Sequence, residues 1–273
     1  TNRGTIRLLG PRVYLYHVGG KLVNAEEGLV DAQVDSEIVW SSRPGRMVEN
    51  HGVLRKSGGT GTTRIGSGVT LMNHGVVETL AGRLEVGGGG RASGSFVASA
   101  NTTLEFDGDY TLGETGTFAG AGTNRISGGT FTVEGMGVLS NAWVAATIRG
   151  TNVTLAGVTE WEGGYLGDGQ SHITVAEGGV LNVRGGSSDS RHVGGVVTNR
   201  GTIRLLVPRL YLYHVGGKLV NAEEGLLDAQ VDSEIVWSAI SGRVVENHGV
   251  LRKSGGTGTT RIGSGVTLMN HGV

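Results

Sequence analysis

Short runs of alternating apolar and polar residues recur along the chain and are separated by glycine-rich turns. Residues 103–106, 130–133 and 173–175 alternate in this way, as expected for strands that bury one face. Gly58 and Gly128 each open a Gly-Gly pair, which marks a turn. Apolar residues do not recur at i, i+3, i+4 and i+7 over the length of a helix. The pattern therefore predicts an all-β chain of short strands.

An asparagine, usually followed two residues later by glycine, sets the spacing of the predicted corners. The first four of these asparagines are separated by 22, 26 and 23 residues, and the last four repeat the same intervals. Periods of this length are typical of solenoids. We expect a single-stranded parallel β-solenoid (β-helix) of roughly 22–26 residues per coil, right-handed because parallel crossovers generally are. The predicted corner residues are Asn2, Asn24, Asn50, Asn73, Asn199, Asn221, Asn247 and Asn270.

A longer repeat contains these coils. Residues 1–76 return as residues 198–273 with 7 differences, which gives a period of 197 residues (198 minus 1). We expect residues 1–273 to form one continuous solenoid, with 1–197 as one super-repeat and 198–273 as the start of a second. Tandem arrays generally provide length and surface. This organisation favours a structural role.

Several segments resemble a known family of repeats. The Val-x-Asn-x-Gly corner, the Ser127–Val133 segment and the Trp161–Leu166 segment resemble those of bacterial haemagglutinin-like and autotransporter-type surface proteins. The resemblance implies an exported rod that serves as an adhesin, stalk or passenger domain, located outside the cell or on its surface. Residues 81–109 depart from the pattern because they lack a clear asparagine corner.

Composition and charge exclude several classes of protein. The 52 glycines lack a Gly-X-Y period, so the chain is not collagen-like, and with no cysteine it has neither disulfides nor cysteine-bound zinc. The net charge of −1, with acids and bases interspersed, gives no footprint for nucleic acid. No apolar run approaches the length of a membrane span, so we expect no membrane insertion in this segment. We also expect no cofactor.

The asparagine corners and the histidines beside them could carry function or only structure. An exposed asparagine ladder could bind a glycan or an ice-like lattice, but we favour a structural role, because asparagine tolerates left-handed backbone and its amide can bond the next rung. The glycine two positions later would supply positive φ or close approach between coils. His51 and His74, one coil apart, could bind metal, but no third ligand is visible. We expect them to be outward polar residues.

Acidic residues leave an enzymatic alternative open. Glu26, Glu27, Asp31, Asp35 and Glu37 recur in the second copy, and β-helix enzymes that cleave polysaccharides group carboxylates on one face. A duplicated active site within one rod would be unusual. We therefore expect a chain that is not an enzyme.

A tyrosine-bearing strand is the strongest candidate for a binding surface. Tyr14 and Tyr16 alternate with Val13 and Leu15, so both rings should project from one face, beside Arg12. The rings could stack on sugars or partner proteins, or could simply cover a neighbouring loop. The candidate contact residues are Arg12, Tyr14, Tyr16, Arg209, Tyr211 and Tyr213.

Together these observations predict a structural segment of a long extracellular fibre, stalk or adhesin. We expect its partners to be copies of itself, joined end to end or side by side through unpaired sheet edges. Surface glycans and the surface of a host or partner cell are further candidates. The alternatives are a polysaccharide-active β-helix enzyme and a glycan-binding module.

Overall fold

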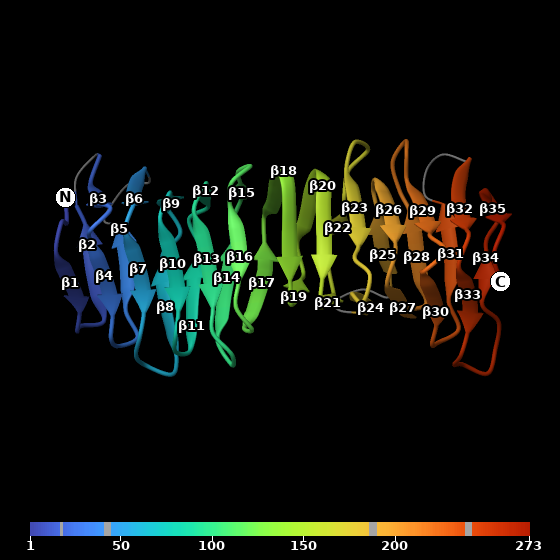
Figure 1. Cartoon of the computed structure of the whole chain (residues 1–273), viewed down its shortest axis with the longest axis horizontal. Coiled ribbons are helices and arrows are strands. Elements are labelled where there is room, and N and C mark those ends of the chain that lie inside the picture. Colours follow the sequence, from blue (N-terminus) through green and yellow to red (C-terminus); the bar gives the residue numbers. More distant parts are fainter. Residues whose placement is uncertain (17–18, 41–44, 186–189, 238–241) are drawn as a thin grey trace. The chain divides into compact units, whose positions relative to one another are not determined.

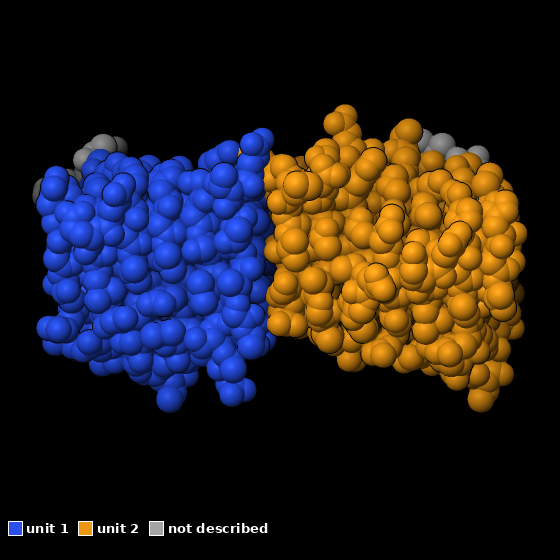
Figure 2. All heavy atoms as spheres, viewed as in Figure 1, with its two compact units in different colours: residues 1–132 blue, residues 133–273 orange. Residues whose placement is uncertain are grey.

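A computed structural model describes residues 1–16, 19–40, 45–185, 190–237 and 242–273. These residues form 35 short β-strands, and no helix occurs among them (Figure 1). The prediction of an all-β parallel solenoid is confirmed: the chain makes about 11 turns of about 22 residues each. The handedness of the coil stays a prediction. Two compact units, Thr1–Thr132 and Val133–Val273, are described separately below (Figure 2).

Unit 1 has three faces, and each consists of parallel strands from successive coils. The first face pairs β1 (Thr5–Leu8), β4 (Leu29–Ala32), β7 (Val53–Lys56), β10 (Val76–Thr79), β13 (Ser95–Ala98) and β16 (Thr117–Ala119). The second face pairs β2 (Arg12–Leu15), β5 (Glu37–Trp40), β8 (Thr62–Ile65), β11 (Arg83–Val86), β14 (Thr103–Asp107) and β17 (Thr123–Gly128). The third face pairs β3 (Lys21–Asn24), β6 (Arg46–Asn50), β9 (Val69–Asn73), β12 (Gly90–Ala92) and β15 (Tyr110–Leu112). Each coil thus contributes one strand to each face.

Unit 2 follows the same plan after β18 (Thr130–Ser140), a strand that contains the boundary between the units. Its first face pairs β19 (Ala142–Val144), β21 (Val158–Trp161), β24 (Val180–Arg184), β27 (Thr202–Leu206), β30 (Leu226–Ala229) and β33 (Val250–Lys253). Its second face pairs β22 (Tyr165–Leu166), β25 (Ser190–Val193), β28 (Arg209–Leu212), β31 (Glu234–Trp237) and β34 (Arg261–Ile262). Its third face pairs β20 (Thr147–Ala156), β23 (His172–Val175), β26 (Val196–Asn199), β29 (Lys218–Asn221), β32 (Arg243–Asn247) and β35 (Val266–Asn270).

The two copies of the 76-residue repeat fold alike. Thr5 pairs with Leu29 between β1 and β4, and Thr202 pairs with Leu226 between β27 and β30, so both partners shift by the 197-residue period. The seven substitutions leave this register unchanged. Val30 and Leu227 are both fully buried, as expected for an exchange of aliphatic core residues. The substitutions at 42–44 lie outside the described residues.

Inward-pointing aliphatic and aromatic side chains stack from coil to coil and fill the bore. On the first face of unit 1, Val30, Leu54, Val77 and Phe96 succeed one another in register and are at most 4% exposed. Alternation within each strand places every second residue in this column, because successive side chains of a strand point to opposite faces. The local pattern of the sequence therefore fixes which residues form the core.

Candidate functional site

The corner asparagines of each unit form a continuous ladder of amide hydrogen bonds. Each Nδ2 donates to the Oδ1 of the next rung: Asn2 to Asn24 at 2.7 Å, and Asn24 to Asn50 and Asn50 to Asn73 at 2.8 Å. In unit 2 the donor–acceptor distances of the three steps are 2.7 Å, along Asn199, Asn221, Asn247 and Asn270. All but the last of these side chains are buried. Because the ladder consumes the amides internally, it presents no polar array to a glycan or an ice lattice.

The expectation that these corners use asparagine for its tolerance of left-handed backbone is wrong. Among the described residues, the only non-glycine residues with positive φ are Asn101, Asn141 and His214, so the corner asparagines have ordinary strand geometry. The glycines that follow them are also not left-handed, and all of them except Gly4 are needed for close approach between coils. A Cβ added at Gly52 would lie 2.3 Å from the carbonyl oxygens of Ala25 and Gly28. The corner therefore selects asparagine for its amide and glycine for its missing side chain.

The histidines beside the corners stack on one another outside the wall. The rings of His51 and His74 lie 4.9 Å apart, and His51 Nε2 lies 2.9 Å from the Glu49 carboxylate. His248 and His271 repeat the stack at 5.0 Å. Within the part of the chain that the structure describes, no group of three His, Cys, Asp or Glu side chains could hold a metal ion. These residues act as an outward ring stack with a carboxylate partner.

The candidate tyrosine patch is exposed in the first copy. Residues 12–15 of β2 alternate as expected, with Arg12 and Tyr14 outward and Val13 and Leu15 turned inward. The rings of Tyr14 and Tyr16 lie 5.7 Å apart and are 45% and 58% exposed. The Arg12 guanidinium lies 3.3 Å from the Glu37 carboxylate, and the proximity of Tyr14 and of Glu37 raises the pKa of Arg12.

The same tyrosines are half-buried in the second copy, because unit 2 places two further coils beside them. Tyr165, His192 and Tyr211 occupy the same position on β22, β25 and β28. The ring of His192 stacks on that of Tyr211 with 5.0 Å between the ring centroids, and the centroids of the Tyr165 and His192 rings are 5.2 Å apart. Tyr213 packs 5.5 Å from Tyr165. Burial, with a smaller effect of Arg191, lowers the pKa of His192.

This aromatic column contains residues that sequence reasoning missed. Tyr165 and His192 lie 46 and 19 residues before Tyr211 (211 minus 165 and 211 minus 192), and the Trp161–Leu166 motif that contains Tyr165 gives no sign of this contact, so only the coil register brings them together. Because His192 and Tyr211 are stacked nearly parallel, each covers a face of the other. A sugar that stacks on an aromatic ring needs an open face. The column is therefore better suited to stabilising the wall than to holding a sugar.

A shallow polar hollow adjoins this column. Ser190, Pro208, Arg209 and Tyr211 line about 330 Å³ on the flank of unit 2. Arg209 is more than half exposed and lies 3.9 Å from Glu234. The hollow brings together two of the predicted contact residues, but it contains no described carboxylate or metal-ligating cluster.

The recurring carboxylates pair with cations from neighbouring coils. The Asp31 carboxylate accepts two hydrogen bonds from Arg55, at 3.2 and 3.1 Å, and Asp228 accepts the same pair from Arg252. The buried ammonium of Lys56 lies 2.7 Å from Asp35. Asp31 and Asp228 therefore form ion pairs between neighbouring strands, and Asp35 forms one with Lys56.

Two further carboxylates were not singled out in the sequence. Glu85 and Glu105 are neighbours in register on the second face of unit 1 and are about 95% buried. Arg64 lies 2.8 Å from Glu85, and Arg83 and Arg125 lie 2.7 and 3.0 Å from Glu105. Three guanidinium groups thus offset this adjacent pair of like charges.

The Arg-bound aspartates predict a loss of stability in acid. Burial opposes ionisation of Asp31, but hydrogen bonds from Arg55, Ser57 and Gln33 outweigh it and lower its pKa from 3.8 to about 2. Hydrogen bonding by Arg252 chiefly lowers the pKa of Asp228 to about 2. A carboxylate with a depressed folded-state pKa stabilises the fold above pH 4, and this contribution disappears as the pH falls toward 2.

We expect each of these aspartates to contribute about 2 kcal/mol that is lost between pH 4 and pH 2. Urea unfolding measured across this range should show a smaller pH dependence in the variant that combines Asp31→Asn with Asp228→Asn. The exposed Glu223→Gln change serves as the control. An unchanged acid response in the double variant would contradict the assignment.

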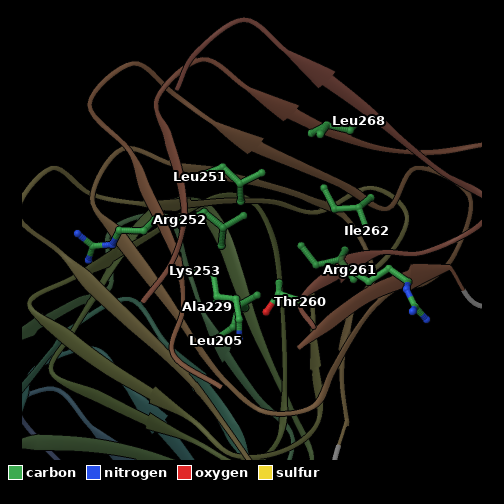
Figure 3. Close-up of a pocket in the computed structure, with 11 residues that line it drawn as sticks. Leu205, Ala229, Leu251, Arg252, Lys253, Thr260, Arg261, Ile262 and Leu268 are labelled. Atoms are coloured by element: carbon green, nitrogen blue, oxygen red, sulfur yellow. The ribbon is translucent and has the colours of Figure 1, made fainter. Parts of the chain in front are cut away.

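A further hollow is the bore beside β33–β35. About 380 Å³ is lined by apolar residues that include Leu205, Leu251, Ile262 and Leu268 (Figure 3). In the first copy the equivalent of Leu268 is Leu71, which is fully buried because β12 pairs with β9. Leu268 itself is 42% exposed. The hollow therefore corresponds in its lining to the core of the first copy.

Comparison with known proteins gives no relative. No family model, no curated protein and no solved structure matches the chain. Among the described residues there is no helix that is long and apolar enough to cross a membrane.

Proposed function

We propose that the chain is a structural, non-catalytic segment of a repetitive extracellular fibre, stalk or surface adhesin. One observation carries the proposal: the 197-residue repeat reproduces the order of the strands and their pairing register, from β1–β9 to β27–β35. Because the second copy repeats the same strands and pairings, it lengthens the solenoid without adding a different site. The location outside the cell follows from the family resemblance of the corner motifs and is part of the proposal.

The arrangement of the candidate residues supports this role. The asparagine amides bond each other, the described recurring aspartates bond arginine or lysine, and the second-copy tyrosines pack against Tyr165 and His192. Each group stabilises stacking between coils. A glycan-binding flank remains the second candidate, favoured by the outward direction of Tyr14 beside Arg12 on β2 and by the neighbouring Tyr16 ring.

The length of the molecule provides the first test. Insertion of one further 197-residue super-repeat should add about nine coils, and hence about 40 Å, because coils stack at the inter-strand spacing of about 4.8 Å. Small-angle scattering of the chain with and without the insertion measures this increment. A compact particle with no axial extension would contradict a continuous fibre.

Incubation with polysaccharides and a glycan array separates the alternatives. A structural segment should release no reducing ends or unsaturated products from acidic and neutral polysaccharides, and should bind no glycan. Binding that is lost in the Tyr14→Ala, Tyr16→Ala variant, but kept in the Tyr165→Ala variant, would instead establish the glycan-binding role. Product release would overturn the proposal in favour of an enzyme.

A further inference from the structure

Two asparagines of the chain differ from the others in sequence and in surroundings. The chain contains 13 asparagines, and two of them, Asn101 and Asn152, have threonine two residues later. Asparagine followed by any residue except proline and then by serine or threonine is the acceptor motif for N-linked glycosylation. A motif this short also occurs by chance. The position of each asparagine in the fold therefore decides whether its amide can accept a sugar.

The fold leaves the amide groups of these two asparagines accessible. Asn101 and Asn152 are exposed, and neither amide bonds to a residue that the structure describes. The corner asparagines bond one another, and Asn182 is 5% exposed and donates to Glu160 at 2.7 Å. Transfer of a sugar needs the amide nitrogen within bonding reach of the donor, so a buried amide held by a neighbour cannot react while the chain stays folded.

Asn101 lies in the turn between β13 and β14. Thr102 fixes this turn from the inside, because it is 5% exposed and its Oγ1 donates to two backbone carbonyls at 2.8 and 3.0 Å. The φ of Asn101 is 64°, in the left-handed region, which asparagine adopts more readily than most residues. Thr103 opens β14 and points away from the bore, opposite to the buried Leu104. The solvent side of the turn thus presents both the amide and the hydroxyl of the motif.

The motif at Asn152 has the same alternation of inward and outward residues. Val153 is fully buried in β20, so Asn152 and Thr154 on either side of it point outward. Thr154 is followed in register by Thr174 on β23 and Thr198 on β26. The wall beside the acceptor therefore consists of small hydroxyl side chains, and a sugar attached to Asn152 extends into solvent without displacing the core.

We propose that Asn101 and Asn152 are acceptors for N-linked glycosylation of the folded chain. The donor is a sugar whose anomeric carbon carries a phosphate leaving group, either a sugar nucleotide or a lipid-linked pyrophosphate. The amide nitrogen bonds to the anomeric carbon and loses one proton, while the bond from that carbon to the phosphate oxygen breaks and the phosphate group keeps the electron pair. The accessibility of the two amides is a property of the folded chain, so this inference does not depend on the proposed function.

Two transferase reactions on the folded chain test the proposal and distinguish the donors. One contains a soluble N-glycosyltransferase with UDP-glucose, and the other a membrane oligosaccharyltransferase with a polyprenyl-pyrophosphate oligosaccharide. Intact-mass spectrometry should show two additions per chain in at least one reaction, and peptide mapping should place them at Asn101 and Asn152. Absence of any addition in both reactions would overturn the proposal.

Single substitutions assign each addition to its motif. Asn101→Asp keeps a residue that tolerates the left-handed turn but removes the acceptor amide, and Asn152→Asp does the same in β20. Each variant should lose one addition and keep the other. Thr103→Val and Thr154→Val keep β-branched side chains and remove only the hydroxyl, and each should also lose the addition at its own motif. Circular dichroism checks that each variant folds, and Asn101→Gly replaces Asn101→Asp if the latter does not.

A matched control separates the effect of the fold from that of the motif. Arg184→Thr places threonine two residues after the buried Asn182, with Val183 between them, as Val153 lies between Asn152 and Thr154. The Arg184 side chain is exposed, so the wall should tolerate the change. The folded variant should gain no third addition. The same variant, diluted from urea into the reaction before it refolds, should gain one. A third addition on the folded variant would contradict selection of the acceptors by their exposure.

Discussion

Replacement of Asn50 with alanine is expected to lower the free energy of unfolding by about 3–5 kcal/mol. The Asn50 side chain is fully buried and accepts a hydrogen bond from Asn24 at 2.8 Å. Its Nδ2 donates to Asn73 at 2.8 Å and to the carbonyl of Val76 at 3.0 Å. Alanine removes these bonds and leaves the amide of Asn24 and the carbonyl of Val76 short of partners, and a buried polar group without a partner costs more than a neutral deletion.

Urea unfolding of Asn50→Ala should be compared with that of Asn270→Ala. Asn270 accepts one rung bond from Asn247 and is exposed, so its loss should cost about 1 kcal/mol. Asn50→Asp is a stricter variant, because an ionised carboxylate still accepts from Asn24 but cannot donate to Asn73. Equal small effects at positions 50 and 270 would show that the ladder does not hold the corner together.

Replacement of Phe106 with alanine is expected to cost a similar amount, about 3–5 kcal/mol. Phe106 is fully buried at the centre of the aromatic cluster of unit 1. Its ring lies 5.1 Å from Phe96, 4.9 Å from Tyr110 and 5.1 Å from Phe131. The cavity left by alanine cannot be filled by neighbours that are themselves held in a stack of coils.

Thermal and urea unfolding of Phe106→Ala and of Phe106→Leu measure this effect. Leucine keeps most of the volume and should cost less than about 1.5 kcal/mol. Protection of amide protons in β13–β15 should fall more than protection in β27–β30, because each coil contacts mainly its neighbours. A uniform loss of protection over both units would contradict a locally packed core.

Much of the fold could be predicted from local pattern. Alternation in segments such as Thr130–Val133 and Ile173–Val175 identified strands, because a strand that buries one face must alternate. The asparagine interval fixed the coil length, because each coil must return to the same corner. Residues 81–109 lack the asparagine corner, yet they still form coils. Their strands β11–β14 are held in place by pairing with the strands of neighbouring coils.

The candidate site was only partly predictable. The outward direction of Arg12, Tyr14 and Arg209 follows from strand alternation and agrees with the structure. The different burial of Tyr14 and Tyr211 does not follow from their sequences, which are locally almost identical. It depends on which coil lies beside each copy.

By itself, the sequence determined the alternating strands and the approximate length of a coil, because these follow from the alternation within each strand and from the interval between corners. Only the tertiary structure decided which side chains meet across coils. It placed His192 on Tyr211, turned the Asn50 amide into the wall and aligned Arg55 between Asp31 and Glu78. The physical reason is the register between coils. Coils differ in length, as the steps from Val53 to Val76 and from Val76 to Ser95 show, so the sequence spacing does not say which residues become neighbours. A register shift of one residue would exchange the inward and outward positions of a strand.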